Sequence, residues 1–159
     1  MSEDYFDKLV ADLQKKVIDS ARKIYSDKVL ACWENPKNFG KLPVYNAHAC
    51  VKGKCGDTVE IFLQIENKRI KDISFLTDGC IGSIVCNATL TDMAKGKSLE
   101  EVLNLSPEDI INILGGLPEA ERHCAELAVK TLNEAIKNFL GGRKDAHLYL
   151  SMSQLCLFI

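Results

Sequence analysis

The sequence lacks an excess of basic residues. Its 20 Lys and Arg residues are outnumbered by 22 Asp and Glu residues, which leaves a net charge of −2. Proteins that bind nucleic acid usually carry a basic patch, so this composition provides no electrostatic case for such a partner. We therefore expect no nucleic-acid partner.

Segments that would direct the chain into a membrane or out of the cell are also lacking. The acidic start, Met1–Asp7, has neither the basic region of a secretory signal nor the arginine-rich character of a transit peptide. The longest apolar stretch, Leu148–Ile159, has 12 residues and is too short to span a bilayer. We therefore expect a cytoplasmic protein with no membrane partner.

The sequence also lacks a Cys-x-x-Cys pair and an even number of cysteines. An odd count of seven, without an export signal, argues against a disulfide framework. Without a Cys-x-x-Cys pair, the sequence supports neither a zinc ribbon nor a thioredoxin-type site. In a reducing compartment, the remaining uses of cysteine are packing, metal binding and catalysis.

What is present is the composition of an ordinary globular domain. The 159 residues are 47% apolar and 26% charged, which suits one domain with a real core and short appendages. Apolar residues recur at three- and four-residue steps from Glu3 to Trp33, which predicts an amphipathic N-terminal helix, either continuous or broken near Ser26. Its polar face has mixed charge, so we expect it to pack on the domain or on a second subunit rather than on a membrane.

Strands come next and helices follow them. Residues 58–65 alternate between apolar and polar, a turn is predicted at 66–68, and residues 70–75 continue as an antiparallel partner, with 44–51 as a third strand. Helical patterns then begin after Gly79, at the capping box of Ser98, at Ser106-Pro107 and at Pro118. This order predicts the α+β fold class.

Three cysteines lie at predicted element ends rather than within an apolar stripe. Cys55 lies in a glycine-flanked turn, Cys80 lies between a strand and a helix, and Cys124 lies near the start of the last helix. Helix N-termini favour the thiolate form of a nearby cysteine, and thiolate is the form that binds metals. Asp57 and His123 can add oxygen and nitrogen ligands, so we expect these five residues to form one metal site.

Each of these residues has a plain alternative interpretation when it is taken alone. Free cysteine often packs as a small hydrophobe, an isolated His123 is typical of a surface or capping histidine, and Asp57 is typical of a turn acid. We assign the packing role to the remaining cysteines, which are Cys32, Cys50, Cys86 and Cys156. A mixed ligand set is unusual for a permanent electron-transfer cluster, which prefers four cysteines, and it suits a cluster that leaves.

Taken together, the motifs from Tyr25 to Leu140 resemble the IscU/NifU-type iron–sulfur assembly scaffolds in order and spacing. The matching segments are 25–29, 34–40, 55–57, 78–80, 93–97, 116–118 and 123–128. The resemblance implies a three-stranded antiparallel sheet packed against several helices, with the ligands at one exposed end. It also divides the chain into an N-terminal helical extension (1–24), a scaffold domain (25–140) and a C-terminal tail (141–159).

The resemblance implies a carrier rather than an enzyme. A cysteine desulfurase delivers sulfur as a persulfide, iron joins, and a two-iron, two-sulfur (2Fe-2S) cluster forms and passes to apo-proteins. By this analogy Cys55, Cys80 and Cys124 bind the cluster or zinc, and Cys124 accepts the persulfide. Asp57 is then a labile ligand and His123 an alternative one. An iron donor or frataxin-like regulator and a second copy of the chain are further expected partners.

The sequence departs from these scaffolds at two places near the predicted site. The family usually has a lysine where this chain has Glu121, and the motif read by a dedicated chaperone is replaced by Leu117–Glu121. We therefore do not expect a dedicated chaperone.

One alternative function is a zinc-dependent persulfide acceptor, in which the metal prepares Cys55 for persulfide transfer and the protein never holds a cluster. The sulfurtransferase-like relatives usually carry an insertion that is absent between Cys80 and Cys124. A metal-stabilised adaptor is the second alternative.

Overall fold

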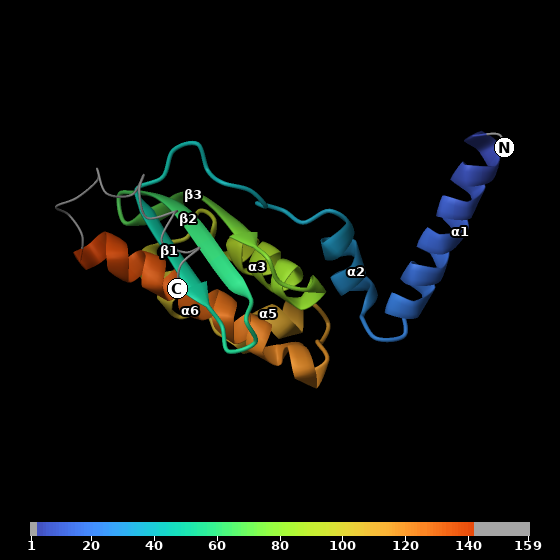
Figure 1. Ribbon diagram of the computed structural model, residues 1–159. Helices are drawn as coiled ribbons and strands as arrows, with labels where there is room; N and C mark the ends of the chain where they lie inside the picture. Colours follow the sequence, from blue (N-terminus) through green and yellow to red (C-terminus); the bar gives the residue numbers. More distant parts are fainter. Residues whose placement is uncertain (1–2, 142–159) are drawn as a thin grey trace.

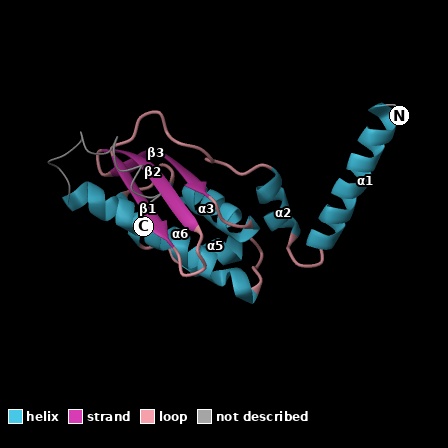
Figure 2. Cartoon of the chain, viewed as in Figure 1, coloured by secondary structure: helices cyan, strands magenta, loops and turns pink. Residues whose placement is uncertain are grey.

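Three antiparallel strands and the helices that follow them form the body of the molecule (Figure 1, Figure 2). The computed structural model describes residues 3–141. The predicted tail beyond Gly141 and its Cys156 lie outside these residues. The helices are α1 (Glu3–Ala21), α2 (Asp27–Glu34), α3 (Ile81–Ala94), α4 (Leu99–Leu103), α5 (Pro107–Ile113), the 3-10 turn η1 (Glu119–Glu121) and α6 (Arg122–Gly141). The strands are β1 (Ala47–Lys52), β2 (Thr58–Glu66) and β3 (Arg69–Thr77).

The sheet has the simplest possible order, β1-β2-β3, with both pairs antiparallel. The turn between β2 and β3 consists of Asn67 and Lys68, both with positive φ (52° and 60°), as a tight two-residue hairpin requires. The register between β2 and β3 places Val59 opposite Thr77 at the far end of the hairpin. The predicted hairpin and its third strand are confirmed.

One face of the sheet is covered by α3 and α6, and α5 packs against these two helices (Figure 1). Alternate side chains of the strands point into this layer, because successive strand residues face opposite sides of the sheet. Ile61, Leu63 and Phe75 of the sheet are fully buried, and Leu90 of α3 and Leu132 of α6 complete the same core. The α+β class and the three-stranded sheet packed against helices are therefore confirmed.

Helix boundaries follow the capping residues with one exception. Ser26 caps α2 by accepting a hydrogen bond from the Val29 amide, so the N-terminal stripe forms two helices, separated by residues 22–26. Ser98 and Ser106 open α4 and α5 with capping boxes, as predicted. The last helix begins at Arg122 rather than at Pro118, because Pro118 caps the short turn η1 that precedes it.

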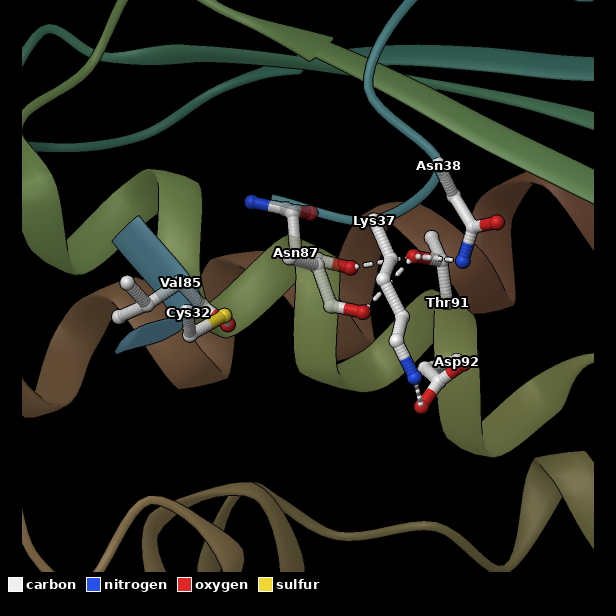
Figure 3. A network of polar contacts seen from close by, with 8 residues as sticks. Cys32, Lys37, Asn38, Val85, Asn87, Thr91 and Asp92 are labelled. Carbon is white, nitrogen blue, oxygen red and sulfur yellow. Dashed lines mark hydrogen bonds and ion pairs between the residues drawn. The ribbon is translucent and has the colours of Figure 1, made fainter. Parts of the chain in front are cut away.

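Polar contacts of Lys37 and Asn38 hold the segment after α2 against α3 and β3. Lys37 forms an ion pair with Asp92, and the Asn38 amide donates a hydrogen bond to the Thr91 hydroxyl (Figure 3). Asn38 adopts a positive φ of 61°, a conformation that asparagine tolerates better than most residues. Its carbonyl accepts a hydrogen bond from the Phe75 amide of β3. The Asn35–Gly40 motif is thus explained by docking of this segment onto the core.

Helix α1 projects away from the rest of the molecule (Figure 1). Its large apolar side chains are exposed: Tyr5, Phe6, Leu9, Leu13 and Val17. This stripe does not pack on the domain, so that part of the expectation is wrong. Packing of α1 against a second subunit remains a prediction. None of the helices within residues 3–141 has the length and apolar character needed to cross a membrane.

The contrast between α1 and the core predicts very different effects of two leucine substitutions on the free energy of unfolding. Leu132→Ala removes a side chain that is 1% exposed, and we expect the free energy of unfolding to fall by about 2–5 kcal/mol. Leu13→Ala removes a side chain that is 53% exposed, and we expect a change within about 0.5 kcal/mol. Urea unfolding followed by the fluorescence of Trp33 measures both. A loss of several kcal/mol for Leu13→Ala would show that α1 is buried in solution.

Candidate metal centre

The hairpin register brings the Cys55–Asp57 turn to the start of α3. Val59 is opposite Thr77, so continuing the same register outward sets Asp57 across from Gly79, next to Cys80. Two hydrogen bonds hold the strand ends together at this point: the Thr58 amide donates to Asp78 Oδ1 (2.6 Å), and the Thr77 hydroxyl donates to the Thr58 carbonyl (2.8 Å). A turn acid and a strand-end cysteine, far apart in sequence, thereby become neighbours.

Helix α6 supplies the third member of this group. Cys80 is the N-cap residue of α3, and Cys124 lies in the first turn of α6, which packs against α3. A carboxylate oxygen of Asp57 and the sulfur atoms of Cys80 and Cys124 all lie within 4.8 Å of one another. We call Asp57, Cys80 and Cys124 the acid–thiol triad. Two sulfur donors and one oxygen donor converging in this way suit a zinc or iron ion.

Ser83 connects two members of the acid–thiol triad. Its side chain is buried, and its Oγ lies 2.8 Å from Asp57 Oδ2 and 3.6 Å from Cys124 Sγ. A hydroxyl has one proton, so the Asp57 carboxylate and Cys124 Sγ compete for the single hydrogen bond that Ser83 can donate. No motif in the sequence predicted this role. The signal was available, because Ser83 follows Cys80 by three residues and so lies on the same side of α3.

The pKa of Cys124 contradicts the expectation drawn from its place at a helix N-terminus. Burial raises the pKa of this thiol to about 12, and the nearby charges of Cys80 and Glu121 act in the same direction, whereas the contact with Ser83 lowers it. Desolvation disfavours the thiolate more strongly than the helix terminus favours it. The expected lowering is therefore wrong for Cys124, whose thiol must lose its proton when it binds a metal.

Cys55 and His123 lie beside the acid–thiol triad rather than within it. Cys55 is exposed on the turn between β1 and β2. A Cβ placed on Gly53 would lie 2.8 Å from a Leu127 methyl and 3.5 Å from Cys55 Sγ, so this turn lies against α6. His123 is exposed, with Nε2 3.6 Å from Cys124 Sγ. The structure thus brings three of the five predicted residues together and leaves two at the edge.

Glu121 adds a second carboxylate next to the site. Tyr25 donates its hydroxyl proton to Glu121 Oε1, and burial followed by this hydrogen bond raises the pKa of Tyr25. The other oxygen, Oε2, is buried and has no hydrogen-bond partner within the described part of the chain. The sequence distinguishes Glu121 only as a departure from the scaffolds that the chain resembles. Neither the pair with Tyr25, 96 residues away in sequence, nor the unpartnered oxygen could be read from the sequence.

The packing role expected for Cys86 and Cys32 is confirmed, whereas the role expected for Cys50 is wrong, because Cys50 is disulfide-bonded. Cys86 is fully buried in the core on α3, and burial raises its pKa. Cys32 is half-buried against the same core, with Sγ 3.9 Å from the Val85 carbonyl (Figure 3), and burial raises its pKa as well. Neither thiol belongs to the acid–thiol triad.

Gly79 leaves the space in which Asp57 and Ser83 meet. A Cβ at this position would lie 2.4 Å from Ser83 Oγ and 2.7 Å from Asp57 Oδ2. We expect Gly79→Ala to lower the free energy of unfolding by about 1–3 kcal/mol through overpacking. We also expect it to weaken zinc binding about tenfold or more by displacing a ligand. Competition with a chromophoric chelator measures zinc affinity. Gly141→Ala, where a Cβ meets nothing within 4 Å, is the control. Equal zinc affinity in both variants would contradict this account of Gly79.

The chain matches the family described as NifU-like N terminal domain over residues 24–146. The iron–sulfur cluster assembly scaffold protein IscU 1 of Archaeoglobus fulgidus is 38% identical over 117 residues, covering 73% of this chain and 76% of that protein. The scaffold IscU of Aquifex aeolicus is 40% identical over 119 residues with the same coverage. A solved N-terminal NifU-like structure from Brucella abortus has a TM-score of 0.61 at 19% identity, covering 75% of this chain and 96% of that one. This last likeness supports the fold.

Proposed function

Because the chain belongs to the family of NifU-like N-terminal domains, we propose that it is a scaffold on which 2Fe-2S clusters are assembled and from which they are passed on. Its relatives in Archaeoglobus and Aquifex are named as iron–sulfur cluster assembly scaffolds, which are carriers rather than enzymes. The single observation that carries the proposal is the acid–thiol triad, whose three donor atoms lie within 4.8 Å of one another.

The ligand set supports temporary rather than permanent binding. Cys80 and Cys124 supply sulfur to the cluster, Cys55 joins from the exposed turn, and Asp57 supplies oxygen. Iron in a stable electron-transfer cluster prefers sulfur ligands, so the Asp57 bond is the weakest of the set. Ser83 competes for the same carboxylate through its hydrogen bond. In this proposal Asp57 is the ligand that dissociates first and His123 replaces it, which its Nε2, 3.6 Å from Cys124 Sγ, supports.

Sulfur arrives in this proposal from a cysteine desulfurase as a persulfide. A scaffold thiolate attacks the outer sulfur, a new S–S bond forms on the scaffold, and the desulfurase cysteine leaves as a thiolate. Each transferred sulfur then needs two electrons from a thiol or ferredoxin-type reductant to become sulfide. We retain Cys124 as the acceptor. Because Cys124 is buried and Cys55 is exposed, acceptance at Cys124 requires its thiol to become accessible to the desulfurase.

Assembly and transfer on the full chain test the proposed function. Anaerobic incubation with a cysteine desulfurase, cysteine, a thiol reductant and ferrous iron is expected to give a brown protein that passes its cluster to an apo-ferredoxin. The readouts are the visible absorption spectrum and the ferredoxin signal. Failure of cluster to form while iron and sulfide are supplied in excess would reject the scaffold function.

A zinc-dependent persulfide acceptor is the second candidate, and one observation favours it. The acid–thiol triad can hold zinc with Cys55 outside the group, exposed and available to accept sulfur. This function predicts that zinc persists through anaerobic reconstitution and that Cys55, not Cys124, carries the sulfane sulfur. Mass spectrometry of the alkylated protein locates the added sulfur. The proposed partners under both functions are an iron donor, a second copy of the chain and the recipient proteins.

A further inference from the structure

The feature without an assigned role is the buried oxygen of Glu121. Glu121 Oε1 accepts the Tyr25 hydroxyl, while Oε2 is shielded from solvent and unpartnered among residues 3–141. A buried carboxylate oxygen without a hydrogen bond is costly, because it has lost its water without gaining another donor. A positively charged partner would stabilise such an atom.

No side chain in the described part of the chain provides that charge. Arg122, the next residue, pairs instead with Glu108, and its Nε lies 3.8 Å from Glu119. Glu121 takes part in none of the ion pairs found within residues 3–141. The charge that would satisfy Oε2 therefore has to come from outside residues 3–141.

The position of this oxygen points to the metal site. Gly82, two residues after Cys80, lies so close that a Cβ there would be 2.7 Å from Glu121 Oε2. The carboxylate thus lies on the first turn of α3, next to the acid–thiol triad, and its charge is felt at Cys124. It is not one of the donors that converge within 4.8 Å, so it lies beside the acid–thiol triad rather than within it.

We propose that Glu121 is an additional oxygen donor for ferrous iron, holding the ion beside Cys80 and Cys124 as it enters the site. This inference rests on the proposed function, since it names a residue that receives the iron. Ferrous iron accepts carboxylate oxygen as well as thiolate, so a buried carboxylate oxygen without a partner among residues 3–141, beside two thiols, suits this ion. Tyr25 acts as a positioning residue, because its hydrogen bond to Oε1 directs Oε2 toward α3.

Iron affinity of the cluster-free full chain tests this proposal without requiring cluster assembly. The variant is Glu121→Gln, which keeps an oxygen for Tyr25 and removes the charge. The matched control is Glu119→Gln, which removes a charge on the same 3-10 turn where the side chain is 94% exposed. Anaerobic titration with ferrous iron against a chromophoric chelator is expected to show about tenfold weaker binding for Glu121→Gln and no change for Glu119→Gln.

Two further measurements separate a ligand from a structural residue. The free energy of unfolding of iron-free Glu121→Gln is expected to equal or exceed that of the wild type, because an unpartnered buried charge has been removed. X-ray absorption of the wild-type ferrous complex is expected to show more than one oxygen neighbour per iron, and one fewer in Glu121→Gln. Unchanged affinity and unchanged oxygen coordination in Glu121→Gln would overturn the proposal.

The scaffold function and the Glu121 assignment fail in distinguishable ways. If Glu121→Gln binds iron like the wild type while both assemble clusters with desulfurase, the scaffold stands and Glu121 is not a donor. If the wild type binds ferrous iron through Glu121 but never forms a cluster, the scaffold function is wrong and the iron site is real. Should Glu121→Gln fold poorly, the oxygen coordination of the wild-type complex decides the question on its own.

Discussion

Cys80→Ala and Cys124→Ala are each expected to reduce the cluster content of the reconstituted protein to about a tenth of the wild-type value or less. Each substitution removes one of the two sulfur donors that converge on the acid–thiol triad. The Asp57 carboxylate cannot replace the missing thiol, and Cys55 is already used as a ligand, because cluster iron depends on thiolate ligands. Iron and acid-labile sulfide per chain, measured after anaerobic reconstitution, give the result directly.

Cys32→Ala is the matched control for this experiment. Cys32 is also a free thiol near α3, but it is half-buried against the core and outside the acid–thiol triad. We expect wild-type iron and sulfide content in this variant, with a modest loss of stability from the missing sulfur. Wild-type cluster content in Cys80→Ala or Cys124→Ala would show that the cluster is held elsewhere.

Asp57→Ala is expected to change the lifetime of the cluster rather than its formation. Asp57 is the oxygen donor of the acid–thiol triad, and Ser83 competes for its carboxylate at 2.8 Å. Without this labile ligand, we expect transfer to apo-ferredoxin to slow by about tenfold, in the range that loss of a metal-site residue usually produces. The time course of the ferredoxin absorption signal measures this rate.

The control for Asp57→Ala removes an acid of similar exposure away from the site. Asp72 lies on β3, where it forms an ion pair with Lys95 at 3.1 Å and accepts a hydrogen bond from the Ile73 amide, so Asp72→Ala is expected to transfer its cluster at the wild-type rate. If Asp57→Ala and Asp72→Ala transfer their clusters at the same rate, Asp57 takes no part in cluster release.

Most of the fold could be predicted from local sequence signals. Alternation along 58–65, the turn at Asn67 and Lys68 and the capping serines at 98 and 106 each specify structure through residues close in sequence. The errors arose where distant contacts decide the outcome. Whether α1 is buried depends on a partner surface that its own stripe does not reveal. The start of α6 depends on how Pro118 directs the chain into a short 3-10 turn.

The site was predicted less completely, and for physical reasons. Cys80, Cys124 and Asp57 could be chosen because their residue types and terminal positions suggest ligands. Their convergence depends on the hairpin register and on the packing of α6 against α3. The raised pKa of Cys124 and the buried oxygen of Glu121 depend on burial, which a sequence motif does not report. Both became visible only when the side chains were placed.

The central claim is that this chain holds an iron–sulfur cluster at the acid–thiol triad. The most direct test is iron, zinc and acid-labile sulfide analysis, with an absorption spectrum, on the full chain reconstituted with desulfurase and ferrous iron without oxygen. The account predicts equal amounts of iron and sulfide and the visible absorption of a 2Fe-2S cluster in the wild type, both lost in Cys80→Ala. Stoichiometric zinc without sulfide, unchanged by reconstitution, would contradict it.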